Sequence, residues 1–218
     1  MAKCSPMFCG AEKRNIMNYH LILASASPRR IDLLSQIGLV FEVIPSDIDE
    51  SKIRDHDHLR NIQLIALCKV QDVARKIKEC GSQRGIVIGA DTQIIIDGEI
   101  LGKPIGRADA LSMLSKLSAR SHQVITGVAI LDIEKGSNET WVEETNVYFR
   151  EISPDEICDY LETGEYIGKA GAYGIQGRAA AFVERIEGCY FNVVGLPLSK
   201  LSQKLRKMQK IQDSDKRI

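Results

Sequence analysis

Apolar residues recur along this chain at two spacings, which alternate from one segment to the next. Short runs of consecutive β-prone apolar residues predict buried strands, and apolar residues three or four positions apart predict helices with one buried face. The predicted strands are His20–Ala24, Phe41–Ile44, Ile86–Ala90 with its continuation Ile94–Ile96, Gln123–Asp132, Thr140–Phe149 and Ala180–Ile186. The predicted helices begin at Pro28, at about Asp57, at Arg107, at Pro154 and at Pro197, and they end at Ile37, Glu79, Leu117, about Glu162 and Met208.

Proline, glycine and small polar residues mark the ends of these elements. Ser27 and Pro28 are typical of an N-cap and a first helical position, because the missing N–H of proline costs nothing in the first turn. Asp97-Gly98 is a strong hairpin signal, and Ser153-Pro-Asp-Glu156 has the pattern of a capping box. Strands and helices alternate early and strands follow one another later. This order predicts an α/β fold with a mixed, twisted sheet flanked by helices.

The chain has 218 residues without an internal repeat or a low-complexity linker, so a single folding unit over residues 17–210 is predicted. Residues 1–16 are polar and irregular, and they are expected to form a disordered extension unless Met17 is the true start. Residues 211–218 are rich in charge and are expected to form a frayed tail.

Composition and charge narrow the classes of function. The 29 basic and 29 acidic residues balance, so no global field attracts this protein to nucleic acid or to an anionic membrane. Apolar stretches such as Ile86–Ala90 are far shorter than the ~20 residues of a membrane span, which excludes a membrane protein. The six cysteines form no CxxC pair, and no secretory segment precedes them. We therefore expect free thiols in a reducing cytoplasm rather than a zinc site or disulfides.

Small polar and basic residues collect in the segment Ser25-Ala-Ser-Pro-Arg-Arg30, between a predicted strand and a predicted helix. Backbone N–H groups at a helix N-terminus point to a common spot, and the helix dipole favours an anion there. Arg29 and Arg30 oppose that dipole, which is unfavourable unless an anion binds beside them. The alternative is that Ser27 only caps the helix and that both arginines are solvated.

Three further polar places interrupt the apolar pattern. Asp47-Ile-Asp-Glu50 offers carboxylates that suit Mg²⁺ or Mn²⁺, although a solvated loop is the simpler interpretation of this segment alone. Asp91-Thr92 stands at the end of a very apolar strand, where a desolvated carboxylate can act as a base or merely form a turn. Gly102-Lys-Pro104 places an ammonium group on a rigid turn, which suits a phosphate but is also common at protein surfaces.

Several nucleotide and hydrolase signatures are missing from the sequence. It contains no P-loop, no GxGxxG after a strand and no GxSxG elbow, which disfavours P-loop NTPases, dinucleotide oxidoreductases and α/β-hydrolases. The acidic and basic places together indicate metal-assisted chemistry at a phosphate group. The residues alone leave the substrate open.

Taken in order, these stretches resemble the Maf family of nucleoside-triphosphate pyrophosphatases. The matching pieces lie between about Leu21 and Leu205 and are Leu21-Ile-Leu-Ala-Ser-Ala-Ser-Pro-Arg-Arg30, Ile48-Asp-Glu50, Gly89-Ala-Asp-Thr92, Gly102-Lys-Pro104, Thr126-Gly-Val128, Lys169-Ala-Gly-Ala-Tyr-Gly-Ile-Gln-Gly177 and Val194-Gly-Leu-Pro197. The resemblance implies an elongated α/β fold with a central cleft, shared with the inosine-triphosphatase group, and a homodimer. It also implies that a divalent metal assists cleavage of a nucleoside triphosphate to the monophosphate and pyrophosphate.

The resemblance further implies roles for single residues. Six positions match residues that bind the substrate, hold the metal or act as the general base: Ser27, Arg30, Lys69 and Lys103 for the substrate, Glu50 for the metal, and Asp91 for the base. Lys69 fits less closely, because the chain reads Cys-Lys-Val where the family often has Glu-Lys-Ala.

Three positions match those that separate a branch acting on dTTP and UTP from a branch acting on 7-methyl-GTP, namely Arg29, Thr92 and Gln176. The amide of Gln176 offers a donor and an acceptor, which suits the O4/N3 edge of thymine or uracil. For that it must be held in place by Thr92, another neighbour or a backbone group.

The expected function is therefore hydrolysis of dTTP and UTP by a cytoplasmic enzyme that binds no nucleic acid. One alternative is a non-catalytic regulator of septum formation and cell division, a role also associated with the family name. Another is a housecleaning pyrophosphatase for modified nucleotides, such as 7-methyl-GTP or inosine triphosphate. The neutral net charge argues against a regulator that binds DNA.

Overall fold

A computed structural model of the chain describes residues 20–215, with side chains up to Met208; the predicted extension at 1–16 and residues 216–218 lie outside this part. The strands are β1 (Leu21–Leu23), β2 (Phe41–Val43), β3 (Ile86–Ile96), β4 (Glu99–Leu101), β5 (Ser121–Asp132), β6 (Asn138–Phe149) and β7 (Val183–Glu187). The α-helices are α1 (Pro28–Gln36), α2 (His58–Glu79), α3 (Arg107–Leu117), α4 (Pro154–Glu162), α5 (Tyr190–Val194) and α6 (Leu198–Asp215), and three 3₁₀ turns are η1 (Glu50–Lys52), η2 (Ala170–Ala172) and η3 (Arg178–Phe182).

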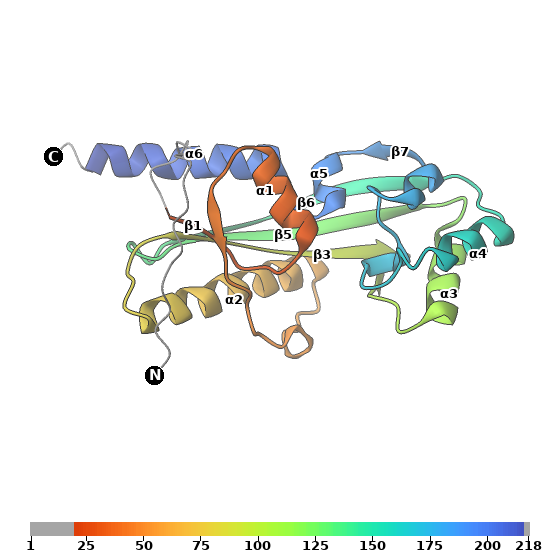
Figure 1. The fold of residues 1–218 in the computed structure, drawn as a ribbon, viewed down its shortest axis with the longest axis horizontal. Helices are drawn as coiled ribbons and strands as arrows, with labels where there is room; N and C mark the ends of the chain where they lie inside the picture. The colour runs from red at the N-terminus through yellow and green to blue at the C-terminus, as the bar shows by residue number, and fades with distance from the viewer. Residues whose placement is uncertain (1–19, 216–218) are drawn as a thin grey trace.

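The sheet is mixed, as the sequence predicts. Its strand order is β2-β1-β3-β5-β6-β7. Strand β4 pairs with β3 on the same edge as β1, but further along β3. Strand β1 runs parallel to β2 and β3, whereas all other pairs are antiparallel. Parallel neighbours need a crossover connection, which α1 and α2 supply. The long strands β3, β5 and β6 extend along the length of an elongated molecule (Figure 1).

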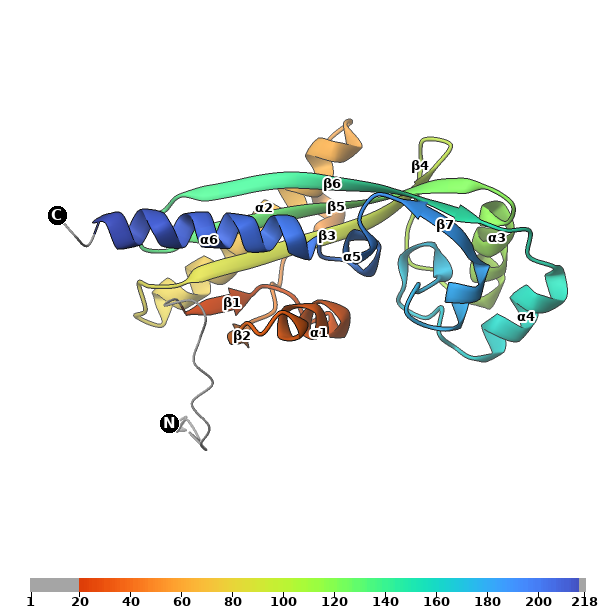
Figure 2. The same cartoon turned by 90° about the horizontal axis from the view of Figure 1, so that it is seen from above.

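Helices cover both faces of one half of the sheet. Ile86 and Ile88 of β3 pack with residues of α1 and α6, and Val87 packs on the opposite face with residues of α2, as the alternation of side chains along a strand requires. In the other half, α3, α4 and η3 surround a second core that includes Val147 and Phe149 of β6. Figure 2 shows these two groups of helices at the two ends of the sheet.

Helix α2 lies unusually close to the sheet because two strand positions opposite it are glycines. A Cβ added at Gly89 of β3 would lie 2.7 Å from Val70 and 2.9 Å from the carbonyl oxygen of Ala66. A Cβ at Gly127 of β5 would lie 2.4 Å from the carbonyl oxygen of Ile62. Any side chain at these positions would push the helix away, and with it the residues that α2 directs at β3.

The local signals predicted from sequence are confirmed. Asp97 and Gly98 both have positive φ and connect β3 to β4, as a two-residue hairpin turn requires. Ser153 and Glu156 form the capping box of α4. Ser27 occupies the N-cap position of α1, but its side chain makes no capping hydrogen bond.

Three predictions differ from the structure. The strand predicted at Ala180–Ile186 begins only at Val183, because η3 occupies the residues before it. The short helix α5 was not predicted, since it has few residues to show a period. Helix α6 continues past the predicted end at Met208 to Asp215, so the first five residues of the expected frayed tail are helical. Among the described residues, no helix combines the length and the apolar character needed to cross a membrane.

Candidate active site

A cavity of about 810 Å³ lies at the middle of β3, between the two groups of helices. Strand β1 pairs with β3 up to Ile88, and β4 pairs with β3 from Ile94 onwards. The intervening residues of β3 therefore have no neighbouring strand on that edge. The turn before α1, the loop after β4, the glycine-rich segment 168–176 and the end of α5 surround this gap.

The gap corrects the predicted setting of Asp91. The sequence places Asp91 at the end of a strand, but β3 continues through it without a break to Ile96. Asp91 is accessible because β1, the neighbouring strand, ends before it. Its side chain is 14% exposed and lines the cavity. The partly desolvated carboxylate is thus present as predicted, for a different geometric reason.

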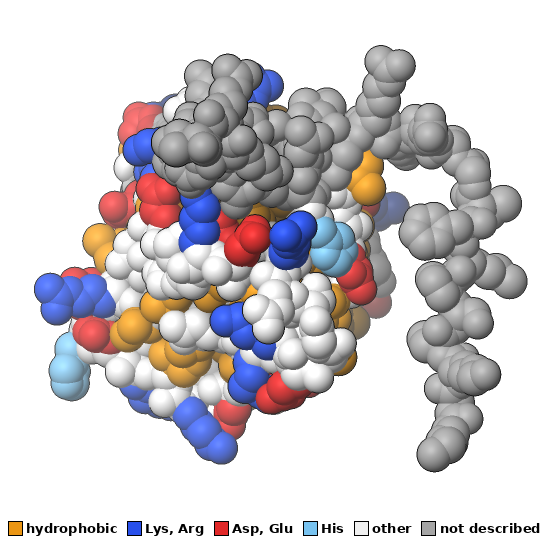
Figure 3. Space-filling model, turned by 90° about the vertical axis from the view of Figure 1, so that its left-hand side faces the viewer, with side chains coloured by type: hydrophobic (Ala, Val, Ile, Leu, Met, Phe, Trp, Pro, Cys, Tyr) orange, Lys and Arg blue, Asp and Glu red, His pale blue; other side chains and the backbone are white. Residues whose placement is uncertain are grey.

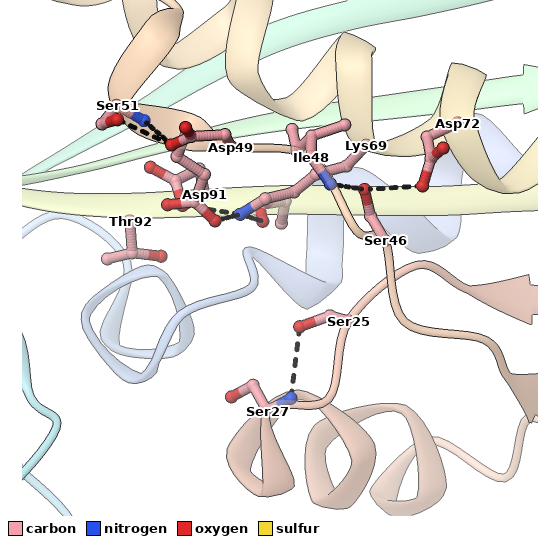
Figure 4. Close-up of polar contacts among 12 residues, drawn as sticks. Ser25, Ser27, Ser46, Ile48, Asp49, Ser51, Lys69, Asp72, Asp91 and Thr92 are labelled. Carbon is pink, nitrogen blue, oxygen red and sulfur yellow. Dashed lines mark hydrogen bonds and ion pairs between the residues drawn. The ribbon is translucent and has the colours of Figure 1, made fainter.

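Lys69 contacts both candidate acidic residues of the site. Helix α2 directs Lys69 across Gly89 towards β3, and its side chain is only 9% exposed. Its Nζ lies 2.8 Å from Oδ1 of Asp91 and 2.7 Å from Oε1 of Glu50, and it donates a longer hydrogen bond to the carbonyl of Ala90. Figure 4 shows Lys69 extending from α2 to Asp91. The weakest of the predicted matches is therefore at the centre of the charged cluster.

The acidic segment before η1 does not act as one cluster. Asp47 forms an ion pair with Lys76, and Asp49 accepts hydrogen bonds from the N–H and hydroxyl of Ser51 (Figure 4). Glu50, which is half exposed, is the residue of this segment that lies against Lys69 and lines the cavity. The structure thus places Glu50, rather than Asp47 or Asp49, against Lys69.

The carboxylates of Glu50 and Asp91 form a small donor set beside Lys69. The described residues contain no group of three or more His, Cys, Asp or Glu side chains that would hold a metal by themselves. Glu50 and Asp91 both contact the same ammonium group, so their oxygens converge on one small region. Mg²⁺ usually takes one or two protein carboxylates and completes its shell with water and substrate phosphates. The donor set fits a cation that is shared with a phosphate ligand.

Arg30 is a buried cation that is largely bound by the protein itself. It is 8% exposed, and burial lowers the pKa of its guanidinium group. Three of its N–H groups donate to the carbonyl of Gly195, the hydroxyl of Ser25 and the hydroxyl of Thr92. An arginine has five N–H donors, so two remain for a ligand.

Ser25 is a site residue that the sequence analysis did not select. Its hydroxyl oxygen accepts hydrogen bonds from the backbone N–H of Ser27 and from Arg30. Because both acceptor positions are in use, its own proton is available as a donor towards the cavity, which Ser25 lines. The available signal was its position directly after the predicted strand His20–Ala24, where the chain turns towards α1. Ser27, the predicted ligand, also lines the cavity.

The cavity is more basic than the rest of the molecule. Five of its lining side chains are basic, namely Arg29, Arg30, Lys69, Lys103 and Lys169, and two are acidic, namely Glu50 and Asp91. Burial lowers the pKa of Arg29, and burial together with the charge of Arg29 lowers the pKa of Lys169. On the face drawn in Figure 3, by contrast, basic and acidic side chains are interspersed wherever the described residues form the surface. Such a local excess of positive charge attracts an anion even though the net charge of the chain is zero.

The glycine-rich segment is held against the sheet by a buried pair. His122 of β5 and Tyr173 share a hydrogen bond of 2.7 Å between Nε2 and the phenol oxygen. Burial lowers the pKa of His122 to about 4, so it is neutral, and burial raises the pKa of Tyr173 well above its ordinary value. Gly171 has a positive φ, and a Cβ there would lie 2.7 Å from Ile94. These contacts set the path of the backbone that leads to Gln176.

The two remaining specificity candidates are placed differently. Gln176 lines the cavity and is exposed, with no side-chain hydrogen bond to any described residue. Thr92 also lines the cavity, but its hydroxyl is bonded to Arg30 and to Thr126. Of the alternatives for holding Gln176, the structure therefore gives no support to Thr92. The structure brings all nine predicted site residues to one cavity.

The chain is similar to known proteins over most of its length. The family described as "Maf-like protein" matches residues 20–208. A protein named "dTTP/UTP pyrophosphatase" from Acetivibrio thermocellus is 50% identical over 188 residues, which cover 85% of this chain and 94% of that protein. Proteins of the same name from Syntrophomonas wolfei (47% identical, 82% and 92% covered) and Ruminiclostridium cellulolyticum (45%, 87% and 96%) are also similar.

One solved structure, titled "The structure of the Staphylococcus aureus Ham1 protein", is similar at a TM-score of 0.41 and 14% identity, over 60% of this chain and 71% of that one. A similarity this low carries no argument about function.

Proposed function

The chain belongs to the Maf family, and from that premise we propose that it is a pyrophosphatase that hydrolyses dTTP and UTP to the monophosphate and pyrophosphate. The observation that carries the proposal is the contact of Lys69 with both Glu50 and Asp91 in the wall of a basic cavity. The names of relatives that cover most of the chain support the choice of nucleotides.

The basic side chains of the cavity bind the triphosphate. Arg30 offers its two remaining N–H groups from a fixed position, and Arg29 and Lys103 have no ion-pair partner among the described residues. The hydroxyl of Ser25 and the backbone at the start of α1 add neutral donors. These groups neutralise a charge that is present throughout the reaction, so they contribute to binding as well as to rate.

Asp91 is the proposed general base. Only Oδ1 of its carboxylate is bonded to Lys69, which leaves Oδ2 to orient a water molecule and take its proton. The water oxygen forms a bond to the α-phosphorus, and the bond between that phosphorus and the oxygen bridging to the β-phosphorus breaks. Pyrophosphate leaves with the electron pair of that bond. The ammonium of Lys69 keeps the carboxylate of Asp91 oriented towards the cavity.

We propose Glu50 as the protein ligand of a divalent cation, Mg²⁺ or Mn²⁺, which it would share with the phosphates of the substrate. When bound, the cation would neutralise negative charge on the departing phosphates. Lys69 already provides one positive charge at this position, and it allows the two carboxylates to approach each other before a nucleotide binds.

Gln176 is the proposed contact to the base. It lies on the rim of the cavity in a glycine-rich segment, where the backbone can approach a planar ligand closely. Its amide has no protein hydrogen bond among the described residues, so we propose that the bound nucleotide brings Gln176 against a neighbour or a backbone group, which fixes the amide for thymine or uracil. Thymine and uracil present the same O4 and N3–H pattern, so we expect similar kcat/KM for dTTP and UTP and lower values for CTP and purine nucleotides.

We further propose a homodimer that acts in the cytoplasm. The cysteines of the described residues, Cys68, Cys80, Cys158 and Cys189, are free thiols, which suits a reducing compartment. Ile105, in the loop after β4, is 99% exposed, and we propose that a second copy of the chain covers it. Size-exclusion chromatography with light scattering would measure the oligomeric state.

The decisive experiment is incubation of the purified protein with Mg²⁺ or Mn²⁺ and a panel of nucleotides, with pyrophosphate and monophosphate measured as products. Release of both from dTTP and UTP at the highest kcat/KM is the expected result. Preference for 7-methyl-GTP or inosine triphosphate would overturn the choice of substrate and leave the reaction intact. Nucleotide binding without turnover would favour a non-catalytic regulator instead.

A further inference from the structure

Arg30 belongs to a closed circuit of hydrogen bonds that connects strands β3 and β5 with helices α1 and α5. Its terminal nitrogen donates to the hydroxyl of Thr92 on β3, and that hydroxyl lies 3.0 Å from the hydroxyl of Thr126 on β5. Thr126 donates to the backbone carbonyl of Asn192 in α5. Three residues further along the chain, the carbonyl of Gly195 accepts a hydrogen bond from Nε of Arg30, which closes the Arg30 circuit.

Strand pairing and the position of α5 bring the groups of the Arg30 circuit together. Thr92 and Thr126 are register partners on neighbouring antiparallel strands, so their side chains stand next to each other on one face. The carbonyl of Asn192 lies in the last turn of a short helix, where carbonyl groups have no partner within the helix. The side chain of Asn192 is fully buried and anchors α5 by donating to the carbonyl of Val124 on β5.

The chemistry of the four groups determines the direction of every proton in the circuit. Arginine can only donate and a carbonyl can only accept, whereas a hydroxyl has a single proton to donate. Thr126 uses its proton on the carbonyl of Asn192, so the bond between the hydroxyls must run from Thr92 to Thr126. Thr92 then accepts from Arg30. All protons point away from Arg30, and hydrogen bonds aligned in this way reinforce one another.

We propose that Thr126 is a positioning residue of the triphosphate site. It acts through Thr92 by fixing the plane of the Arg30 guanidinium, so that the two free N–H groups of Arg30 face the phosphates before they bind. Thr126 is fully buried and does not line the cavity, so it has no direct contact with a ligand there. The inference rests on the proposed function for the identity of the ligand, and on the hydrogen bonds alone for the role of Thr126.

The test compares Thr126→Val, which keeps the shape of the side chain but removes the hydroxyl, with Thr126→Ser, which keeps the hydroxyl. The dissociation constant of α,β-imido-dUTP, an analogue with a nitrogen bridge at the cleaved bond, is measured by calorimetry, and kcat and KM are measured for dTTP. Loss of one buried hydrogen bond predicts a rise of roughly 5- to 30-fold in Kd and KM for Thr126→Val. Thr126→Ser should bind within about threefold of wild type, a difference smaller than the loss of a typical hydrogen bond.

Thr163→Val is the matched control. Thr163 ends α4, and its hydroxyl donates to the carbonyl of Tyr160 and accepts from the N–H of Glu165, away from the circuit and outside the cavity lining. It removes a hydroxyl in the same way as Thr126→Val and should leave Kd within about twofold of wild type, a difference smaller than the loss of a typical hydrogen bond. In an Arg30→Met background, Thr126→Val should have no further effect on Kd.

Three outcomes overturn the inference. They are wild-type affinity in Thr126→Val, equal loss of affinity in Thr163→Val, and an undiminished effect of Thr126→Val in the Arg30→Met background. A wild-type protein that binds the analogue but releases no pyrophosphate from dTTP would refute the proposed function only. The comparison of dissociation constants would then still decide the role of Thr126.

Discussion

Replacement of Asp91 by Asn is the most direct test of the proposed mechanism. Asparagine has the same size, and its Oδ1 can still accept the hydrogen bond that Lys69 donates to Asp91. Lys69 also keeps its ion pair with Glu50. The variant should therefore fold, with a loss of about 1–2 kcal/mol in the free energy of unfolding and a decrease in Tm of roughly 2–8 °C.

The effect on rate should be far larger, because an amide cannot take a proton from water. A positioned general base contributes ~10²–10⁴-fold to a rate, which corresponds to about 2.7–5.4 kcal/mol of activation free energy. We expect kcat for dTTP to fall by that factor, while the Kd of α,β-imido-dUTP changes by less than about tenfold because the basic groups are intact.

The assay is release of pyrophosphate from dTTP under saturating nucleotide and Mg²⁺, with circular dichroism and thermal unfolding as controls for folding. Asp49→Asn is the matched control, since Asp49 lies one residue from Glu50 but bonds to Ser51. Its kcat should stay within about twofold of wild type, in contrast to the loss expected for a general base. Turnover by Asp91→Asn within threefold of wild type would refute the assignment of the base.

Four further predictions follow from the site. Arg30→Lys should raise the KM for dTTP by about tenfold or more, since an ammonium cannot replace the planar contacts of a guanidinium; an unchanged KM would contradict this. Gln176→Ala should reduce the preference for dTTP over CTP by roughly 5- to 100-fold, and by more than it lowers kcat/KM for dTTP; an unaltered ratio would exclude Gln176 as the base contact. Chelation of divalent cations should abolish pyrophosphate release, and added Mg²⁺ or Mn²⁺ should restore it; activity that survives chelation would refute the proposed metal. The pKa of His122 is about 4 in the folded protein and about 6.5 in the unfolded chain, so between these values the unfolded state binds more protons and stability must fall as the pH falls. Between pH 7 and pH 4 the free energy of unfolding should therefore fall by about 3 kcal/mol through His122. This decrease should be absent from His122→Phe in denaturant titrations at the two pH values.

The elements of this protein were largely predictable from sequence because their signals are local. The capping box at Ser153, the turn at Asp97-Gly98 and the period of apolar residues in α2 each act within a few positions of the chain. The same holds for the boundaries of α1 and α3. Local hydrogen bonds and one buried face favour these elements, and the global fold agrees with them.

Candidate chemistry could also be named from sequence, but its geometry could not. The family resemblance selected Lys69, Glu50 and Asp91, yet nothing local indicates that one ammonium lies between two carboxylates. That arrangement depends on the glycines of β3 and β5 that bring α2 close to the sheet. Asp91 was predicted at a strand end, whereas its accessibility comes from the early end of β1, a neighbouring strand.

The tertiary structure alone decided which polar groups support Arg30. Its partners Thr92 and Gly195 are 62 and 165 positions away in the chain, and Thr126 reaches it only through Thr92. Bonds of this kind exist because strand pairing and the packing of α5 bury their donors and acceptors together, where each must find a partner. A threonine within an apolar strand carries no local sign of that requirement. The residue types of the site could therefore be read from the sequence, and their hydrogen-bond partners only from the fold.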